Sequence, residues 1–311
     1  MKEPHLVSVV VPVFNAESYL RSSIVSICKQ TYQNLEIICV DDSSKDTSLS
    51  ILNDLAKNDR RIKVLSNKVN LGISETLNYG FKFANGSIFV RMDADDEALP
   101  NRIESQLNCL IKNNYGLVGS PVIYITEHGD VIGSSRYFND FQVITGLKWK
   151  STIGHPTWMI RRDVFIKLQG YRNLSPAEDY DFLLRCVKEN IKLGMTKQPL
   201  LKFRTQSSLG GTAIEQGLVQ RRMFNYVKFI NSTDKTIDWQ IVDSIKKYNG
   251  IFKVLYKRSQ IFYTVAMKHK YAKNYLRLTI WLVAALFISP HQLQFFLRAL
   301  MSHFKFTKFW K

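Results

Sequence analysis

The sequence predicts an α/β protein built on a mostly parallel sheet, and three observations lead to this class. Apolar stretches rich in Val and Ile alternate with stretches of helical period along the first two hundred residues. The apolar stretches are short enough to be strands, and neither an internal repeat nor a low-complexity linker interrupts the alternation. Strands joined through helices of this length need right-handed crossovers, which lay the strands parallel in one sheet.

The predicted elements can be followed from the N-terminus. Leu6–Pro12 is rich in β-branched residues, which is typical of a strand buried on both faces. Residues 74–86 have a helical pattern, and Gly86 is the expected C-cap of that helix. The other elements expected in the first hundred residues are helices at 16–30 and 47–59 and strands at 35–42, 61–67 and 87–93.

The next hundred residues predict further strands and a helix that begins with acids. Glu178 and Asp179 come at the start of this helix, where unpaired N–H groups and the helix dipole favour carboxylates. The elements expected here are a helix at 101–114, a strand pair within 116–135 that turns at 128–130, and the acid-led helix within 175–190.

The charge of the chain divides it into two parts. The net charge is +17, yet residues 1–210 hold 26 Lys and Arg against 22 Asp and Glu, which is only +4. Residues 211–311 hold 17 against 4, which is +13. We therefore expect one α/β domain over residues 1–210, followed by a basic, aromatic-rich helical tail.

An uncharged run in the tail, Leu278–Ser289, is twelve residues long, short of the ~20 that span a bilayer as a helix. Basic residues interleaved with aromatic ones favour a helix that lies on an anionic membrane surface. The alternative is that the run is a buried helix packed on the domain.

Acidic residues follow two of the predicted strands. Asp41 and Asp42 end one strand, and Asp93, Asp95 and Asp96 follow another. In parallel sheets ligands bind beyond the carboxyl ends of the strands, so these carboxylates should meet there. Like charges this close repel, and a divalent cation such as Mg²⁺ or Mn²⁺ removes the repulsion. The alternative is an acidic turn that caps the next helix.

Two further features narrow the chemistry. A carboxylate at Asp42 can accept a hydrogen bond from a pyrimidine N3–H or a ribose hydroxyl, although it also fits helix capping. No GxGxxG motif follows the first strand, so NAD or FAD binding is disfavoured. The Glu178-Asp179 pair offers a general base far along the chain from the other acids, or else simply the acids of a first helical turn.

Four ordered blocks carry a family resemblance over residues 5–205: "VSVVVPVFNAESYLRSSIVSICKQTYQNLEIICVDDSSKDTS", "NLGISETLNYGFKFANGSIFVRMDADDEALPNRIESQ", "HPTWMIRRDVFIKLQGYR" and "AEDYDFLLR". The chain resembles family 2 glycosyltransferases with the GT-A fold, most of all bacterial enzymes that build O-antigen or exopolysaccharide. The resemblance implies a catalytic domain at residues 1–210 that uses a nucleotide-sugar donor and Mg²⁺ or Mn²⁺.

The resemblance also implies roles on the donor side. Asp42, with Asp41 as its supporting neighbour, matches the acid that recognises a uracil-like base. The residues that would border the base and ribose are Pro12, Phe14 and Glu17. The DxD-type motif is formed by Asp93, Asp95 and Asp96; it orients the ribose and holds the metal, with Asp95 and Asp96 as metal ligands.

On the acceptor side, the resemblance implies that Asp179 is the general base of an inverting transfer, with Glu178 beside it. His155 and Trp158 stand where an acceptor-side wall is expected, or are a structural His and a core Trp. Arg204 is available to neutralise phosphate.

The implied reaction is the transfer of one sugar per encounter, because the QxxRW motif of processive synthases is missing. UDP-hexose is the favoured donor on the Asp42 argument. The implied acceptor is a glycan on a polyprenyl diphosphate carrier. This acceptor, together with the basic tail, predicts a peripheral protein at the cytoplasmic face of the inner membrane.

Two rival functions fit parts of the sequence. A metal-dependent nucleotidyltransferase or phosphohydrolase also gathers carboxylates, but it needs a phosphate-gripping Gly- or Lys-rich loop that "VFNAES" does not supply. A nucleic-acid-binding protein would explain the charge of +17, but the acidic strand ends would repel a phosphate backbone. We therefore expect no nucleic-acid partner.

Overall fold

The computed structural model describes residues 5–205, 211–247, 280 and 283. The chain divides into two compact units, Met1–Ser207 and Ser208–Lys311. The first holds both sheets and the helices α1 to α7, and the second holds α8 and α9.

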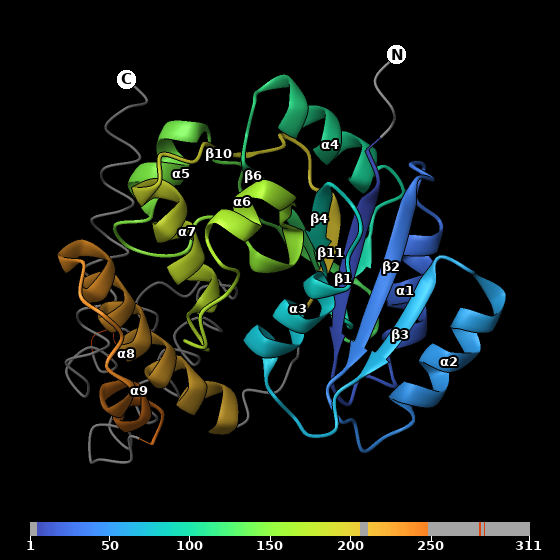
Figure 1. The fold of residues 1–311 in the computed structure, drawn as a ribbon, viewed down its shortest axis with the longest axis horizontal. Helices are drawn as coiled ribbons and strands as arrows, with labels where there is room; N and C mark the ends of the chain where they lie inside the picture. Colours follow the sequence, from blue (N-terminus) through green and yellow to red (C-terminus); the bar gives the residue numbers. More distant parts are fainter. Residues whose placement is uncertain (1–4, 206–210, 248–279, 281–282, 284–311) are drawn as a thin grey trace. The chain divides into compact units, whose positions relative to one another are not determined.

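A seven-stranded sheet forms the centre of the first unit, in the order β10-β6-β9-β4-β1-β2-β3 (Figure 1). Only β9 runs antiparallel to its neighbours, β4 and β6, so the sheet is mostly parallel, as expected. Its strands are β1 (Val7–Val13), β2 (Leu35–Asp41), β3 (Ile62–Ser66), β4 (Ile88–Arg91), β6 (Leu117–Gly119), β9 (Met159–Arg161) and β10 (Leu193–Met195).

Helices cover both faces of this sheet, which explains why β1 is apolar except at Ser8 (Figure 1). Val7, Val9 and Val11 lie in one core cluster together with side chains of α1, α2 and α4. On the other face α3 lies close, because a Cβ on its Gly80 would fall 2.5 Å from Val10. The helices are α1 (Leu20–Cys28), α2 (Ser48–Asn58), α3 (Ile73–Lys82), α4 (Arg102–Lys112), α5 (Asp140–Gly146), α6 (Arg162–Lys167) and α7 (Glu178–Lys188).

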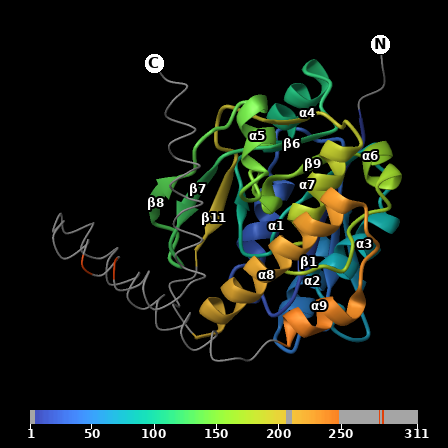
Figure 2. The same ribbon diagram turned by 90° about the vertical axis from the view of Figure 1, so that its left-hand side faces the viewer.

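A second, four-stranded sheet has the order β5-β11-β7-β8, and its strands β11, β7 and β8 are seen side by side in Figure 2. The expected turn joins β7 to β8 and has Gly129 at a φ of 92°. The strands are β5 (Glu97–Ala98), β7 (Val122–Ile125), β8 (Val131–Ser134) and β11 (Leu201–Arg204).

Gly86 does not cap α3, contrary to expectation. The helix already ends at Lys82, with Phe83 as its C-cap. Gly86 instead allows two chain segments to approach, because an added Cβ would lie 2.5 Å from the Leu6 carbonyl oxygen. Its N–H donates to Ser8 Oγ at 2.8 Å, so the glycine fixes the entry into β4.

The second unit is described over two helices, α8 (Gly211–Thr233) and α9 (Trp239–Lys246). The Asp238 side chain caps α9 by accepting hydrogen bonds from the N–H groups of Gln240 and Ile241. Within the described residues, no helix has the length and apolar character needed to cross a bilayer. The apolar run at 278–289 falls almost wholly outside the described residues, so its placement stays a prediction.

Candidate functional site

The parallel strands β1, β2 and β4 bring their carboxyl ends to one edge of the sheet. Val13 of β1 is paired with Asp41 of β2, and Val10 of β1 is paired with Arg91 of β4. The acidic residues that follow β2 and β4 are therefore delivered to the same edge.

Asp93, Asp95 and Asp96 form a cluster just beyond β4, in which one oxygen of each carboxylate lies within 4.8 Å of the others. Asp96 is fully buried, and its Oδ1 accepts a hydrogen bond from the backbone N–H of Arg204 at 2.9 Å. Its Oδ2 is also buried and makes no hydrogen bond to any described residue. Three converging carboxylates with a bare buried oxygen fit the oxygen-ligand preference of Mg²⁺ or Mn²⁺.

The electrostatics of the cluster favour a bound cation. Burial, followed by the charge of Asp93, raises the pKa of Asp96 to about 8. The same two causes raise the pKa of Asp95. A divalent ion would reverse these shifts, because it stabilises the ionised carboxylates.

Arg91 is a central residue of the site, although the sequence predicted it only as part of a strand. Its side chain is 1% exposed and donates from Nη1 and Nη2 to the two carboxylate oxygens of Asp93, at 3.0 and 2.6 Å. The buried Arg102 supports this strand end, because its Nη2 donates to the carbonyl oxygens of Arg91 and Pro156, both at 2.8 Å. A charged residue in an apolar strand was the available signal.

Asp42, the predicted base-recognition residue, is largely occupied by the protein itself. Its Oδ1 accepts from Asn67 Nδ2 at 2.7 Å and from the Leu71 N–H at 2.9 Å. Its Oδ2 accepts from the Gly72 N–H at 2.9 Å. The carboxylate thus holds the loop between β3 and α3, while Oδ1 of the neighbouring Asp41 is buried without a hydrogen bond to any described residue.

The predicted base-and-ribose residues lie around the loop that follows β1. Pro12 is in β1 itself, and Phe14 is 49% exposed beyond it, so its ring is accessible for stacking. Glu17 is exposed, and its Oε2 accepts from the N–H and the Oγ1 of Thr47. These hydrogen bonds lower the pKa of Glu17 and tie the loop to the start of α2.

Glu178 and Asp179 form the first turn of α7, as expected. Asp179 is partly exposed; burial raises its pKa, while hydrogen bonds that include one with Ser151 act in the opposite direction. Burial, followed by the charge of Asp179, raises the pKa of Glu178 to about 7. Glu178 Oε2 is buried and makes no hydrogen bond to any described residue. The Glu178 carboxyl group can therefore exchange a proton near neutral pH.

His155 lies next to Glu178, and the Trp158 ring packs against His155. His155 Nδ1 is 3.7 Å from Glu178 Oε1, and His155 Nε2 is 3.1 Å from the Tyr171 hydroxyl. Burial lowers the pKa of His155, so the imidazole is neutral at pH 7. Trp158 is completely buried and donates from Nε1 to the Ile153 carbonyl oxygen. The structure therefore favours the core-Trp interpretation and places His155 against Glu178.

Arg204 is not available to a phosphate, which corrects the expectation for this residue. Its side chain is 4% exposed, and its Nη2 donates to Glu97 Oε1 at 3.0 Å. Nε donates to the carbonyl oxygen of Asp95, and Nη1 donates to those of Thr126 and Glu127. Arg204 instead holds the backbone of the acidic cluster against the second sheet.

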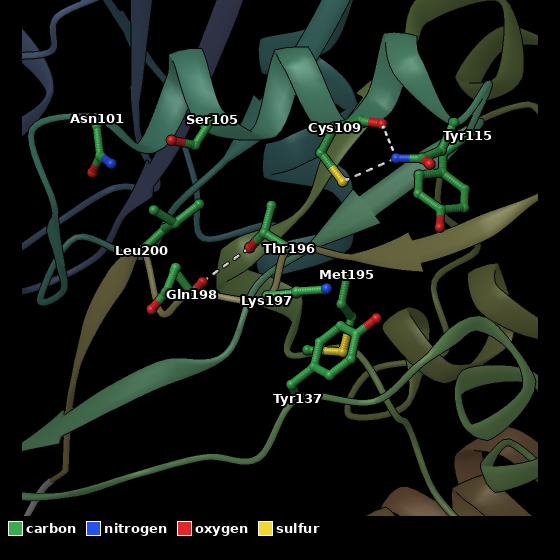
Figure 3. Close-up of a pocket in the computed structure, with 11 residues that line it drawn as sticks. Asn101, Ser105, Cys109, Tyr115, Tyr137, Met195, Thr196, Lys197, Gln198 and Leu200 are labelled. Carbon is green, nitrogen blue, oxygen red and sulfur yellow. Dashed lines mark hydrogen bonds between the residues drawn. The ribbon is translucent and has the colours of Figure 1, made fainter.

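The structure also has a pocket of about 310 Å³ that is separate from the acidic residues (Figure 3). It lies between α4 and the chain from β10 to β11, and it contains none of the site residues predicted from the sequence. Asn101, Tyr137 and Lys197 are among its lining residues. The acidic cluster that could hold a metal ion lies instead at the carboxyl edge of the sheet.

Residues 8–169, more than half of the chain, match the family described as Glycosyl transferase family 2. The chain belongs to glycosyl transferase family 2. This match includes both acidic strand ends and the His155 segment, and it confirms the resemblance on which the glycosyltransferase expectation depended.

Two curated relatives from Escherichia coli give the scale of the similarity. The family 2 chain is 32% identical over 202 residues to the O-antigen biosynthesis glycosyltransferase WbnJ. That alignment covers 64% of this chain and 79% of WbnJ. It is 38% identical over 113 residues to the UDP-Glc:alpha-D-GlcNAc-diphosphoundecaprenol beta-1,3-glucosyltransferase WfgD. That alignment covers 36% of this chain and 44% of WfgD.

A solved structure shows the fold. The mannosyltransferase PcManGT from Pyrobaculum calidifontis, in complex with GDP-Man and Mn²⁺, aligns with a TM-score of 0.60 at 15% identity. The alignment covers 91% of this chain and 86% of PcManGT. The chain therefore has the GT-A fold that the sequence predicted.

Proposed function

We propose that this glycosyltransferase transfers one sugar per encounter from a nucleotide-sugar to a hydroxyl group of a glycan acceptor, with inversion and with a divalent metal. UDP-hexose is the favoured donor, which the name of the UDP-Glc-dependent relative WfgD supports. The acceptor is a glycan carried on a polyprenyl diphosphate, and the process is the synthesis of a bacterial surface polysaccharide. The names of WbnJ and WfgD support this process and this acceptor.

One observation carries the proposal. The carboxylates of Asp93, Asp95 and Asp96 converge at the carboxyl edge of the parallel sheet, and a buried oxygen of Asp96 is left without a hydrogen bond among the described residues. Buried polar atoms are almost always paired, so this oxygen is suited to a ligand that arrives with the substrate. The rival nucleic-acid function gains nothing from such a cluster.

The residues of the chain divide the work between donor and acceptor. Asp95 and Asp96 would hold Mg²⁺ or Mn²⁺, which supplies Lewis-acid stabilisation to a diphosphate leaving group. The exposed Phe14 ring offers a stacking surface for the base. Asp179 accepts the proton of the acceptor hydroxyl as that oxygen attacks the anomeric carbon, opposite the departing diphosphate. Burial raises the pKa of Asp179, which makes its carboxylate a stronger base.

The donor and metal can be tested without knowing the acceptor. We expect a thermal-shift screen of nucleoside diphosphates and nucleotide-sugars to show stabilisation by one base in the presence of Mn²⁺, growing with ligand concentration. Oligonucleotides serve as the control for the nucleic-acid alternative. If no nucleotide stabilises the protein in a metal-dependent way, the proposal is wrong.

We also propose that the protein works as a peripheral protein at the cytoplasmic face of the inner membrane, because a polyprenyl-linked acceptor resides in a bilayer. The +13 charge of residues 211–311 supports this placement. Binding to liposomes should rise with the fraction of anionic lipid and fall with salt. Binding that is indifferent to both would contradict an electrostatic attachment.

A further inference from the structure

Arg91 brings a buried positive charge to the end of a central strand. Taking a guanidinium out of water is costly unless it is paired, and Asp93 provides the pair through two parallel hydrogen bonds. This fork fixes both oxygens of the Asp93 carboxylate, since a guanidinium presents its donors in a rigid plane. Arg91 therefore controls the orientation of one member of the donor-side cluster.

The same guanidinium also acts on the acceptor-side acids. Its charge opposes the rise in the pKa values of Asp95 and Asp96, which belong to the cluster beyond β4. It has the same effect on Glu178 and Asp179, which belong to α7. One buried cation thus lies within electrostatic reach of both groups of carboxylates.

The backbone links the same two regions. The Arg91 N–H donates to the Trp158 carbonyl oxygen at 3.1 Å, so the end of β4 is held against the segment that carries His155. His155 in turn lies 3.7 Å from Glu178. A shift at Arg91 would therefore be transmitted towards α7 through the hydrogen bond to Trp158 and the close approach of His155 to Glu178.

Several residues of this network have buried side-chain atoms without a hydrogen bond. Six buried side-chain atoms of the described residues have no hydrogen bond, and three of them are Arg91 Nε, Asp96 Oδ2 and Glu178 Oε2. Such atoms are uncommon in folded proteins and are often found at functional sites. If the Arg91 guanidinium served only to neutralise Asp93, the buried atoms without hydrogen bonds on both Asp96 and Glu178 would have no explanation.

We propose that Arg91 is a positioning residue that holds the donor-side acids and the acceptor-side acids in one fixed arrangement. The inference rests on the proposed glycosyl transfer. The two hydrogen bonds from its guanidinium orient Asp93. Its charge and its place at the end of β4 keep the Asp93 carboxylate at a fixed position relative to Glu178 and Asp179. Arg91 thus serves the chemical step more than the binding of either substrate.

The chain offers a matched control for this role. Arg61 also makes a fork two residues from its partner, with Nε 3.0 Å from Asp59 Oδ1 and Nη2 2.7 Å from Asp59 Oδ2. That pair lies at the start of β3, and none of the predicted site residues belongs to it. Arg91→Lys and Arg61→Lys each keep the charge and remove the fork.

Two readouts separate positioning from binding. The first is the affinity for Mn²⁺ in the presence of UDP, followed by electron paramagnetic resonance of free Mn²⁺. The second is the rate of UDP release from UDP-glucose with water as acceptor. For Arg91→Lys we expect the Mn²⁺ affinity and the donor KM to stay within about threefold, while kcat falls about 100-fold, as for a small misplacement of reacting groups. Arg61→Lys should match the unaltered protein in Mn²⁺ affinity, donor KM and kcat.

A double-mutant cycle with Glu178→Gln tests the connection to the acceptor side. If Arg91 acts through that side, the losses in kcat from Arg91→Lys and Glu178→Gln will not multiply in the double variant. Fully multiplicative losses would overturn the connection. A kcat for Arg91→Lys within about threefold of the unaltered protein would overturn the positioning role altogether, on the same scale of misplacement.

Chemical rescue distinguishes a local effect of the Arg91 side chain from a loss of folding. In Arg91→Ala, millimolar guanidinium chloride should restore part of the UDP release, because the ion can occupy the space left by the side chain. Absence of rescue in a variant that still binds Mn²⁺ and UDP would count against the inference. If the unaltered protein itself shows no Mn²⁺-dependent UDP binding, the proposed function fails first, and the inference falls with it.

Discussion

Two acidic strand ends of the same sheet behave in opposite ways. Asp42 after β2 and Asp96 after β4 are both almost completely buried, with 4% and 0% exposure. The Asp42 carboxylate accepts three hydrogen bonds from the loop between β3 and α3, whereas Asp96 Oδ2 has none among the described residues. The difference teaches that burial alone does not mark a functional acid. What matters is whether the protein already satisfies the carboxylate.

Asp179 is the site where this comparison predicts the largest effect. We expect Asp179→Asn to lower turnover by about 10³-fold, because an amide cannot accept the hydroxyl proton and general-base catalysis is worth 10²–10⁴-fold. Binding of UDP with Mn²⁺ should be nearly unchanged, as isothermal titration calorimetry can show. Turnover close to that of the unaltered protein would remove Asp179 from the mechanism.

Asp96 should give the next largest effect, and it acts on the metal. Asp96→Asn keeps the shape but removes a charge that a divalent ion needs, so we expect Mn²⁺-dependent nucleotide binding to weaken by at least about 100-fold, more than the loss of an outer-shell partner costs. Electron paramagnetic resonance of Mn²⁺ measures this directly. Binding equal to that of the unaltered protein would mean that Asp96 holds no metal.

Asp42 should affect folding more than turnover. In Asp42→Asn, an NH₂ group replaces one of the carboxylate oxygens that accept hydrogen bonds, and it faces a donor that it cannot pair with. The loss of hydrogen bonds to a charged acceptor lowers the free energy of unfolding by about 2 kcal/mol. This corresponds to a drop in Tm of about 4–8 °C for a unit of this size. Calorimetry of the variant checks the drop. A normal Tm combined with lost UDP affinity would instead support the predicted base-recognition role of Asp42.

Much of the fold was predictable because it depends on local patterns. Strands such as β1 show their burial through β-branched residues, and α7 shows its start through Glu178 and Asp179. The convergence of acids was also predictable, because parallel strands deliver their carboxyl ends to one edge.

The contacts of single residues were not predictable, because they depend on segments far apart in the chain. Arg204 seemed free for a phosphate, but Glu97 and the chain around Thr126 come beside it only through the pairing of β11 with β5 and β7. Arg91 seemed to be one residue of a strand, and its relation to Glu178 appears only in the folded chain. Sequence pattern gives the elements, whereas side-chain partners require the topology.

The smallest effect that we predict concerns pH and Glu178. The folded protein holds the Glu178 pKa at about 7, above its ordinary value of 4.5, so the folded state binds the proton more tightly than the unfolded state does. This contribution to stability is complete below pH 4.5 and is lost as pH rises to about 7. Without metal, the free energy of unfolding should therefore fall across this range. Each pKa unit corresponds to about 1.4 kcal/mol.

Glu178→Gln should flatten this pH dependence by about 1 kcal/mol or more, since glutamine does not titrate and a shift of one pKa unit is worth that amount. Part of the slope should remain, because the pKa of Asp96 is also raised, to about 8. Glu189→Gln is the matched control: Lys167 lowers the pKa of Glu189, so its contribution changes only below pH 4.5. Urea titrations between pH 5 and 8, with a chelator present, measure the slopes. Equal slopes in the unaltered protein and Glu178→Gln would show that the Glu178 carboxyl is satisfied in the fold, as that of Asp42 is, and would place it on the structural side of the comparison.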